Sequence, residues 1–499
     1  MRLGSLILKL GITLIPVMAR ASEFDVQDKV NSFFEAINGV IASFLFFPVP
    51  PFDIPLVLCV MVLGGIFFTF RYTFTNVKLF RHAIHVVMGK YDDPSHEGEI
   101  SHFQALTSAL SATVGLGNIA GVAVAIQLGG PGTVFWLWVV AFFGMSMKFS
   151  SCTFAQLYRE VDSDGKIVGG PMVYLKQAFA QQLNLPKLGK VLSVFFCLAT
   201  ILASFGGGNM FQANQTYELL AQQFPVLADY PLIVGIVLAL LAGVVVIGGI
   251  QSIAKVTSKM VPAMVVFYVI ACLAIILSNA SQIIPMLGKI ISEAFKPDAA
   301  VYGTFIGVFI QGVKRASFSN EAGVGSAAIA HAAAKTDEPV REGVVAMLGP
   351  FIDTIVVCTM TALAVLMTNS HLDPALANKG ALITAKAFSS LGSFMPILLT
   401  VAVVVFAYST IISYSYYGER AASYLFGKKA VAPFRLVYVF LIICGPLLKL
   451  GAVIEFSDLA LLSMAFPNIL GMIFISSKVK SLVDDYYTRF KAGKMKMYN

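Results

Sequence analysis

Two short stretches of the chain place glycines and polar side chains inside otherwise apolar segments. The first is TVGLGNIAGVA, residues 113–123, and the second is FSNEAGVGSAAIAHAAA, residues 318–334. Glycine costs roughly 1 kcal/mol relative to alanine inside a helix, so the clustered glycines predict a break in each segment. Half-helix N-termini at such breaks favour anions, and unwound carbonyls favour cations. The two stretches therefore predict a site for a small zwitterion and a metal cation.

The same glycines allow two other interpretations. Gly117-x-x-x-Gly121 fits the packing of small residues between membrane helices. GVGSAA, residues 323–328, matches a dinucleotide-binding fingerprint, but that motif requires a preceding strand and a βαβ unit, for which the sequence gives no signal. Matching interruptions in two halves of a chain point instead to a transporter site, and we favour that interpretation.

Charged side chains also occur within apolar segments. A carboxylate such as Asp353, in GPFIDTIVVC, costs about 2.5–3.5 kcal/mol at the centre of a membrane helix and is functional by default. Asp353 is expected to bind a cation or couple a proton, or else to pair with a neighbouring hydroxyl. Glu321 is a second coupling candidate, or it caps the second half-helix. We expect Lys148 to reach the membrane surface by snorkelling and His331 to be interfacial.

Enzyme chemistry has little support in the sequence. No nucleophile–base set, P-loop or paired catalytic carboxylates occur at recognisable spacing. His96, Glu97 and His102 in KYDDPSHEGEISH do not have the spacing of a helical zinc motif, so this segment is expected to be a solvated loop. The cysteines are expected to be buried small hydrophobes; they are Cys59, Cys152, Cys197, Cys272, Cys358 and Cys444.

Composition points to a membrane protein. Of 499 residues, 57% are hydrophobic and 12% are charged, about half the charged share of soluble domains. Many apolar segments have lengths close to the roughly 20 residues that a helix needs to cross a bilayer core. The net charge of +8 is not pooled in one patch with exposed aromatics, which argues against nucleic-acid binding.

Apolar length and polar breaks predict an all-α polytopic protein with about eleven spans. They lie near 54–75, 105–127, 133–158, 188–210, 231–249, 259–278, 303–332, 343–368, 394–422, 434–453 and 458–477. The ranges 303–332 and 394–422 are long for the hydrocarbon, so each is expected to break or tilt.

The breaks fall in the second and seventh predicted spans, each the first of a set of five. Because five is odd, the second set must have the opposite topology. We therefore expect an extra helix at 54–75, a first inverted repeat at 105–278 and a second at 303–477.

The ends of the chain and the loops predict its orientation. Residues 1–21 resemble a cleaved signal peptide, with an uncleaved helix as the alternative, and 22–53 form an amphipathic segment outside. The predicted inner loops are rich in Lys and Arg; they hold Lys78, Arg81, Lys90, Arg159, Lys166, Lys255, Lys259, Lys335, Arg341, Lys428 and Lys429. The tail at 478–499 is then cytoplasmic, in a plasma-membrane protein with its N-terminus outside.

Longer motifs resemble a known family. SALSATVGLGNIAGVAVAIQLGGPGTVFWLWVVAFFGMSMKF, FSNEAGVGSAAIAHAAA, FIDTIVVCTMTAL and FAYSTIISYSYYGER are similar to the alanine or glycine:cation symporter family. The resemblance covers nearly all of the chain after its first fifty residues. It implies the leucine-transporter-type fold, one extra helix and a five-plus-five core. It also implies uptake of a small neutral amino acid, alanine or glycine, coupled to sodium as the co-transported ion, with no other cofactor.

The resemblance also implies roles for individual positions. The substrate site is expected to comprise the N–H groups near Leu116 and Gly117, together with Gln212, Phe318, Gly323 and Tyr414. Cation ligands are expected from the carbonyls of Thr113 and Val114, Asn118, Ser319, the carbonyl of Ala407, and Ser409 or Thr410. These are the oxygen ligands that a hard cation prefers.

Other functions stay open at this stage. Coupling to protons through Asp353 or Glu321, a channel, and a sensor that binds an amino acid without transport are the alternatives. Lys314 and Arg315 could form a gate with Glu321 or face an outer vestibule. The exact amino acid, the ion stoichiometry and the oligomeric state do not follow from the sequence.

Overall fold

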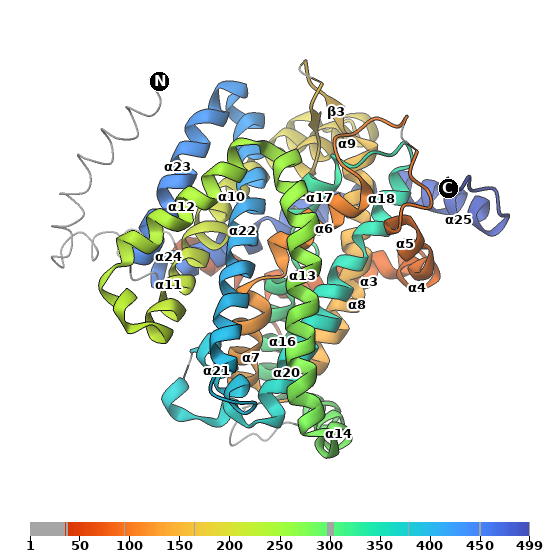
Figure 1. Ribbon diagram of the computed structural model, residues 1–499. Coiled ribbons are helices and arrows are strands. Elements are labelled where there is room, and N and C mark those ends of the chain that lie inside the picture. Colours follow the sequence, from red (N-terminus) through yellow and green to blue (C-terminus); the bar gives the residue numbers. More distant parts are fainter. Residues whose placement is uncertain are drawn as a thin grey trace.

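The computed structural model describes residue 35 and residues 38–93, 95–163, 165–296, 304–377, 379–448 and 451–498. Long helices running up and down the molecule make up most of it (Figure 1). The predicted signal peptide, 1–21, lies outside the described residues, as do residues 22–34, 36 and 37 of the segment 22–53.

Every predicted span coincides with helical structure. In order, the spans are α3 (Leu56–Arg71), α6 (His102–Thr113) with η1 (Gly117–Gly121) and α7 (Val122–Gly129), α8 (Gly132–Leu157), α10 (Pro186–Phe205) with η2 (Gly206–Met210) and α11 (Phe211–Gln223), α12 (Pro231–Ile247), α13 (Gly249–Ser278), α16 (Phe305–Asn320) with α17 (Ala327–His331), α18 (Pro339–Ala346) with α19 (Leu348–Pro350), η5 (Phe351–Cys358) and α20 (Thr359–Met367), α22 (Met395–Phe426), α23 (Val431–Cys444), and α24 (Gly451–Ser463) with α25 (Ala465–Lys491).

Shorter elements connect these spans. The helical ones are α4 (Thr75–Lys78), α5 (Phe80–Val87), α9 (Pro171–Leu183), η3 (Pro225–Asp229), η4 (Ala280–Gln282), α14 (Ile283–Phe295), η6 (Ser370–Leu372), η7 (Pro374–Leu376), α21 (Gly380–Ser389), η8 (Lys428–Ala430) and η9 (Gly445–Leu447). Two antiparallel hairpins pair β1 (Pro48–Val49) with β2 (Ile54–Pro55), and β3 (Glu160–Val161) with β4 (Ile167–Val168).

Length and composition mark out the membrane-spanning helices. Among the described residues, seven helices are long and apolar enough to cross a bilayer, and eight if the bent pair α6–α7 counts as one span. Two further predicted spans, α3 and α12, are shorter apolar helices. The all-α membrane architecture is confirmed.

Several predicted boundaries were wrong. The helix over Pro186–Gln223 continues through a π-helical turn at Gly206–Met210, so the span predicted to end at 210 extends to Gln223. α22 is one unbroken helix of 32 residues, so of the two expectations for this long span, a break or a tilt, the break is excluded. α25 runs on to Lys491, so most of the predicted tail at 478–499 is helical.

The other long predicted span and the first glycine stretch are both interrupted. α6 ends at Thr113, and its axis meets that of α7 at 53° across the break. α16 ends at Asn320, and α17 begins only at Ala327. α6 packs against α17 and α7 packs against α16, so the two interrupted spans lie side by side and run in opposite directions (Figure 1).

Glycine shapes the second break through backbone conformation and close approach. Gly323 and Gly325 have φ of +88° and +93°, which L side chains rarely adopt. A Cβ atom on Gly325 would lie 2.8 Å from Pro171 Cγ. The chain can therefore leave the helix here and pass close to its neighbours only because no side chain is present.

Candidate functional site

A cavity of about 320 Å³ lies against both breaks. Its lining residues come from the interrupted spans and from the helices that face them: Ala112, Thr113, Gly115, Leu116, Gly117, Ala120, Gly121, Val124, Ala203, Gly207, Gly208, Phe211, Gln212, Gln215, Arg315, Phe318, Glu321, Gly380, Thr410, Tyr414, Asp458 and Leu461. On the first interrupted span the lining begins at Ala112, and it includes η1 and Val124 of α7. The cavity therefore flanks the α7 and α16 side of the breaks rather than the α6 and α17 side.

Five of the six predicted substrate positions line this cavity: Leu116, Gly117, Gln212, Phe318 and Tyr414. The sixth, Gly323, does not. A Cβ atom there would lie 2.8 Å from Ile469 Cδ1 and 3.1 Å from Met147 Sδ, so Gly323 serves helix packing at the break. Gly323 is therefore separate from the other five positions, and nothing in its surroundings supports a contact with substrate.

A buried polar cluster around Asp353 joins the two interrupted spans to η5. Asn118 Nδ2 donates to Ser319 Oγ at 3.2 Å and to the Asp353 carbonyl at 3.1 Å. Ser319 Oγ donates to Asp353 Oδ1, and Thr354 Oγ1 donates to the same oxygen at 2.9 Å. The other carboxylate oxygen, Asp353 Oδ2, is buried and has no hydrogen-bond partner among the described residues. An unpaired buried carboxylate oxygen is suited to bind a cation or a proton.

Asn118 also explains how the first break is held. Its Oδ1 accepts the backbone N–H of Gly115 at 3.0 Å, so the amide satisfies a donor that the interrupted helix has freed. Because an amide oxygen has two lone pairs, Asn118 can still accept or coordinate a second group.

A second oxygen-rich cluster lies where α22 crosses the end of α6. The hydroxyl oxygens of Ser409 and Thr410 each lie 3.2 Å from the Ser111 carbonyl oxygen. Ser413 Oγ donates to Ser111 Oγ at 2.9 Å. A Cβ atom on Gly115 would lie 2.9 Å from Thr410 Oγ1, so the unwound segment passes directly over this hydroxyl.

The remaining predicted cation ligands have different positions. Thr113 lines the cavity, and Val114 is the extended, fully buried residue that ends α6. Ala407 is fully buried within the regular helix α22. There the Phe406 carbonyl accepts the hydroxyls of Ser409 and Thr410, at 2.8 Å and 3.2 Å.

Glu321 connects the second break to α22. It ends α16 in the left-handed conformation, with φ of +53°, and it lines the cavity. One carboxylate oxygen accepts Ser326 Oγ and the other accepts the Tyr414 hydroxyl. The Tyr414 ring in turn covers Gly208, where a Cβ atom would clash with the ring. The carboxylate therefore fixes the orientation of a cavity-lining aromatic ring.

Lys148 does not snorkel to a surface as expected. Its side chain is buried in α8, and Nζ donates to the Asn320 carbonyl at 3.0 Å, at the C-terminal end of α16. A cation at a helix C-terminus complements the partial negative charge there. Lys148 therefore supplies a fixed positive charge beside the second break, and its central position in the predicted span was the sequence signal for this.

Arg315 and Asp458 are cavity-lining charges that the sequence did not assign to the substrate site. The Arg315 guanidinium lies 5.9 Å from the centroid of the Phe318 ring. A side chain on Gly121 would collide with Arg315, so the glycine makes room for it. Arg315 and Glu321 line the same cavity, so both alternatives for Arg315, a gate with Glu321 and an outer vestibule, stay predictions.

The segment at 90–102 is only partly solvated. Ser95 and Glu97 are exposed, but Glu99 N–H donates to the Ala333 carbonyl at 2.8 Å and His102 is buried. His331 is not exposed at a surface: it is fully buried, with Nδ1 2.5 Å from Glu342 Oε1.

Comparison with known proteins decides the class of this site. The model of the "Sodium:alanine symporter family" matches residues 39–499. The chain belongs to this family. It is therefore a multi-pass membrane transporter and not an enzyme, and it couples amino-acid symport to sodium as the co-transported ion.

Relatives of this symporter differ in their substrates. The sodium/alanine symporter AgcS of Methanococcus maripaludis is 44% identical over 85% of this chain and 92% of its own length. The "Probable sodium/glutamine symporter GlnT" of Bacillus subtilis is 33% identical over 88% of this chain and 89% of its own length. The crystal structure of MhsT in complex with L-phenylalanine has a TM-score of 0.54 at 13% identity, covering 76% of this chain and 99% of MhsT. This similarity confirms the leucine-transporter-type fold.

Proposed function

We propose that this symporter carries alanine or glycine together with sodium, by alternating access to one site between the two breaks. The observation that carries the proposal is the cavity against Gly115–Gly117 and Glu321, with an oxygen cluster behind each interrupted span. The name of the 44% identical relative, a sodium/alanine symporter, supports alanine.

The substrate would lie with its carboxylate at the N–H groups near Leu116 and Gly117, where the peptide dipoles of the following half-helix favour an anion. Its side chain would face Phe318 and Tyr414. Both rings line the cavity, and Tyr414 is held by Glu321, which leaves room for a small side chain.

Sodium would occupy the two oxygen clusters. The first comprises Asn118, Ser319 and Asp353, whose free Oδ2 supplies the negative charge. The second comprises the hydroxyls of Ser409 and Thr410 with carbonyls of the unwound segment after Thr113. Hydroxyl, carbonyl and carboxylate oxygens are the ligands that hard cations prefer.

We further propose that residues 105–278 and 303–477 are inverted repeats, with the N-terminus outside and the C-terminus in the cytoplasm of a plasma-membrane protein. The antiparallel course of the two interrupted spans supports the repeats. The lysine- and arginine-rich loops support the orientation.

Purified protein in liposomes would test the function. We expect labelled L-alanine to accumulate when sodium is higher outside, with saturation, and unlabelled alanine or glycine to compete better than glutamine. Accumulation that ignores sodium but follows a pH gradient would establish proton coupling instead. Binding without accumulation would favour a sensor, and flux that does not saturate would favour a channel.

A matched pair of substitutions tests the position of the substrate. A Cβ atom on Gly117 would lie 3.8 Å from the Phe318 carbonyl oxygen, an ordinary contact, so Gly117→Ala should bind alanine within a fewfold of the wild type. Gly117→Leu fills the cavity and should abolish binding measured by equilibrium dialysis. Wild-type binding by Gly117→Leu would show that the substrate lies elsewhere.

A further inference from the structure

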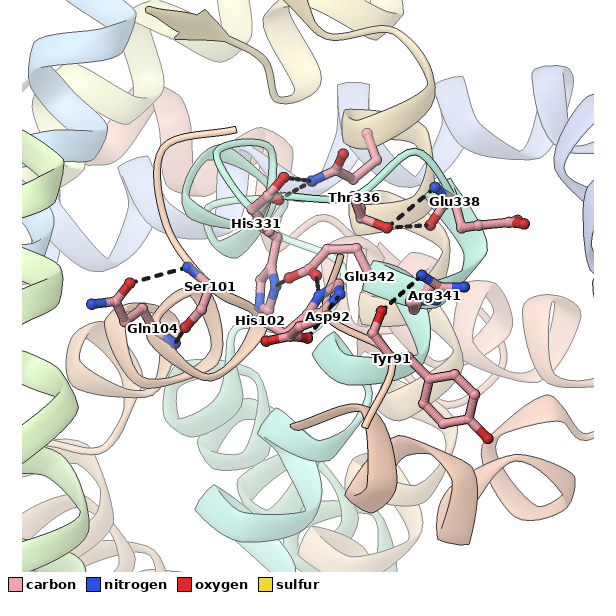
Figure 2. A network of polar contacts seen from close by, with 12 residues as sticks. Tyr91, Asp92, Ser101, His102, Gln104, His331, Thr336, Glu338, Arg341 and Glu342 are labelled. Atoms are coloured by element: carbon pink, nitrogen blue, oxygen red, sulfur yellow. Dashed lines mark hydrogen bonds and ion pairs between the residues drawn. The ribbon is translucent and has the colours of Figure 1, made fainter. Parts of the chain in front are cut away.

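A buried cluster outside the cavity joins the far ends of both interrupted spans. His102 is the first residue of α6, and His331 is the last residue of α17. Figure 2 shows the two rings on either side of the Glu342 carboxylate, which belongs to α18. We call these three residues the histidine–glutamate cluster.

Each oxygen of the Glu342 carboxylate accepts a hydrogen bond from the histidine of one half-helix. His331 Nδ1 donates to Oε1 at 2.5 Å, and His102 Nδ1 donates to Oε2. Glu342 and His331 are fully buried, and His102 is 1% exposed. The other ring nitrogen of each histidine has no hydrogen-bond partner within the described structure, so each ring directs its one hydrogen bond at Glu342.

The charged groups around the cluster come from several elements. Asp92 Oδ1 lies 3.8 Å from His102 Nε2, beyond hydrogen-bonding distance (Figure 2). Arg159, just after α8, donates to the Ala334 carbonyl at 2.6 Å, and Arg341 of α18 donates to the Tyr91 carbonyl at 3.1 Å. Neither arginine is bound to Glu342 by a hydrogen bond, so within the described structure the two imidazoles are the side chains that satisfy this carboxylate.

The backbone ties the same two ends together. Glu99 N–H donates to the Ala333 carbonyl at 2.8 Å, and Lys335 N–H donates to the Ile100 carbonyl at 2.8 Å. The segment before α6 and the segment after α17 therefore form one paired unit. Removing one hydrogen-bond partner from a buried carboxylate costs more free energy than separating an exposed pair. Movement of one half-helix away from Glu342 while the other stays bound is therefore unfavourable.

We propose that Glu342 is a positioning residue of the transport cycle. It holds α6 and α17 together and so keeps the protein closed on the α6 and α17 side of the breaks, while the cavity flanks the α7 and α16 side. Opening of this side then requires the two half-helices to separate from Glu342 as a unit. The proposal rests on the alternating access proposed above, and it adds the residues that join the two half-helices.

Hydrogen–deuterium exchange of the full-length purified protein, measured by mass spectrometry, tests this joining without any substrate. Removing one imidazole should loosen the other half-helix as well. We expect His331→Ala to speed exchange in α6 about tenfold, and His102→Ala to do the same in α17. In His331→Asn the amide places an N–H donor near the Nδ1 position, so exchange in α6 should stay within about twofold of the wild type.

A distant histidine provides the control. His371 is also buried, and its Nδ1 has no hydrogen-bond partner among the residues that the structure describes, but it lies in η6, outside the cluster. His371→Ala should leave exchange in α6 and α17 unchanged. Faster exchange confined to the helix that carries each substitution, or no rescue by His331→Asn, would overturn the proposal. Failure of alanine uptake by the wild type would instead refute the proposed function and leave this measurement unaffected.

Discussion

Asp353 shows at the scale of single residues how an apolar segment accommodates a carboxylate. One oxygen accepts the hydroxyls of Ser319 and Thr354, and the other is buried without a hydrogen-bond partner in the described part of the chain. The two expectations for Asp353, pairing with a hydroxyl and binding a cation, are therefore compatible, because they concern different oxygens. The pairing is observed, and the role in cation binding stays a prediction.

Neutralising Asp353 tests that role. Asp353→Asn keeps the shape and the acceptor for Ser319 but removes the charge, so the sodium concentration that gives half-maximal alanine uptake should rise about tenfold or more. Uptake into liposomes at varied external sodium measures this. Asp373→Asn is the matched control, because Asp373 is paired with Lys386 outside the cavity and should leave sodium dependence unchanged. An unchanged sodium dependence in Asp353→Asn would remove this residue from the cation site.

At the scale of secondary-structure elements, the two breaks are built differently. In the first, Val114 adopts an extended conformation and Asn118 accepts the freed Gly115 N–H. In the second, Gly323 and Gly325 have positive φ. Glycine at Gly115 therefore provides space beside Thr410, whereas the glycines of the second break provide backbone conformation.

This difference predicts the effect of a single methyl group. Gly325→Ala would require φ near +93° and would place Cβ 2.8 Å from Pro171 and 2.9 Å from Asn468, so it should destabilise the protein by roughly 2–4 kcal/mol. The loss would appear as a lower thermal unfolding midpoint in detergent. In Gly243→Ala, inside α12, the new methyl meets Val439 at 3.8 Å, so stability should be kept. Equal midpoints for the two variants would contradict this explanation of the second break.

At the scale of the whole molecule, α5 joins the end of α25 through a buried histidine. His82 Nε2 lies 2.7 Å from the Tyr486 hydroxyl, and the ring packs 4.5 Å from that of Phe490, between centroids. Burial lowers the pKa of His82 from 6.5 to about 4. The imidazole is therefore neutral in the folded protein at pH values where it would be charged in the unfolded chain.

The sign of the resulting pH dependence follows from proton binding. Below pH 6.5 the unfolded chain binds a proton that the folded protein binds only near pH 4, so His82 destabilises the fold as pH falls through this window. The free energy of unfolding should fall by about 2 kcal/mol from this group between pH 8 and pH 5. His82→Gln, which can keep a bond to Tyr486 but does not titrate, should show a smaller drop in thermal midpoint on acidification. A drop equal to that of the wild type would show that other groups dominate.

The sequence by itself determined the helical membrane fold, the positions of both breaks and most of the cavity-lining residues on the interrupted spans. Hydrocarbon length and the requirement to satisfy backbone polar groups act locally, so apolar runs and clustered glycines report them directly. Only the tertiary structure decided which residues each buried group contacts. Lys148 at Asn320, Glu342 between His102 and His331, and Gly323 against Ile469 all join residues far apart in the chain or on different helix faces. The partner of a buried group depends on how the helices pack together, and the spacing of residues along one helix does not encode that packing.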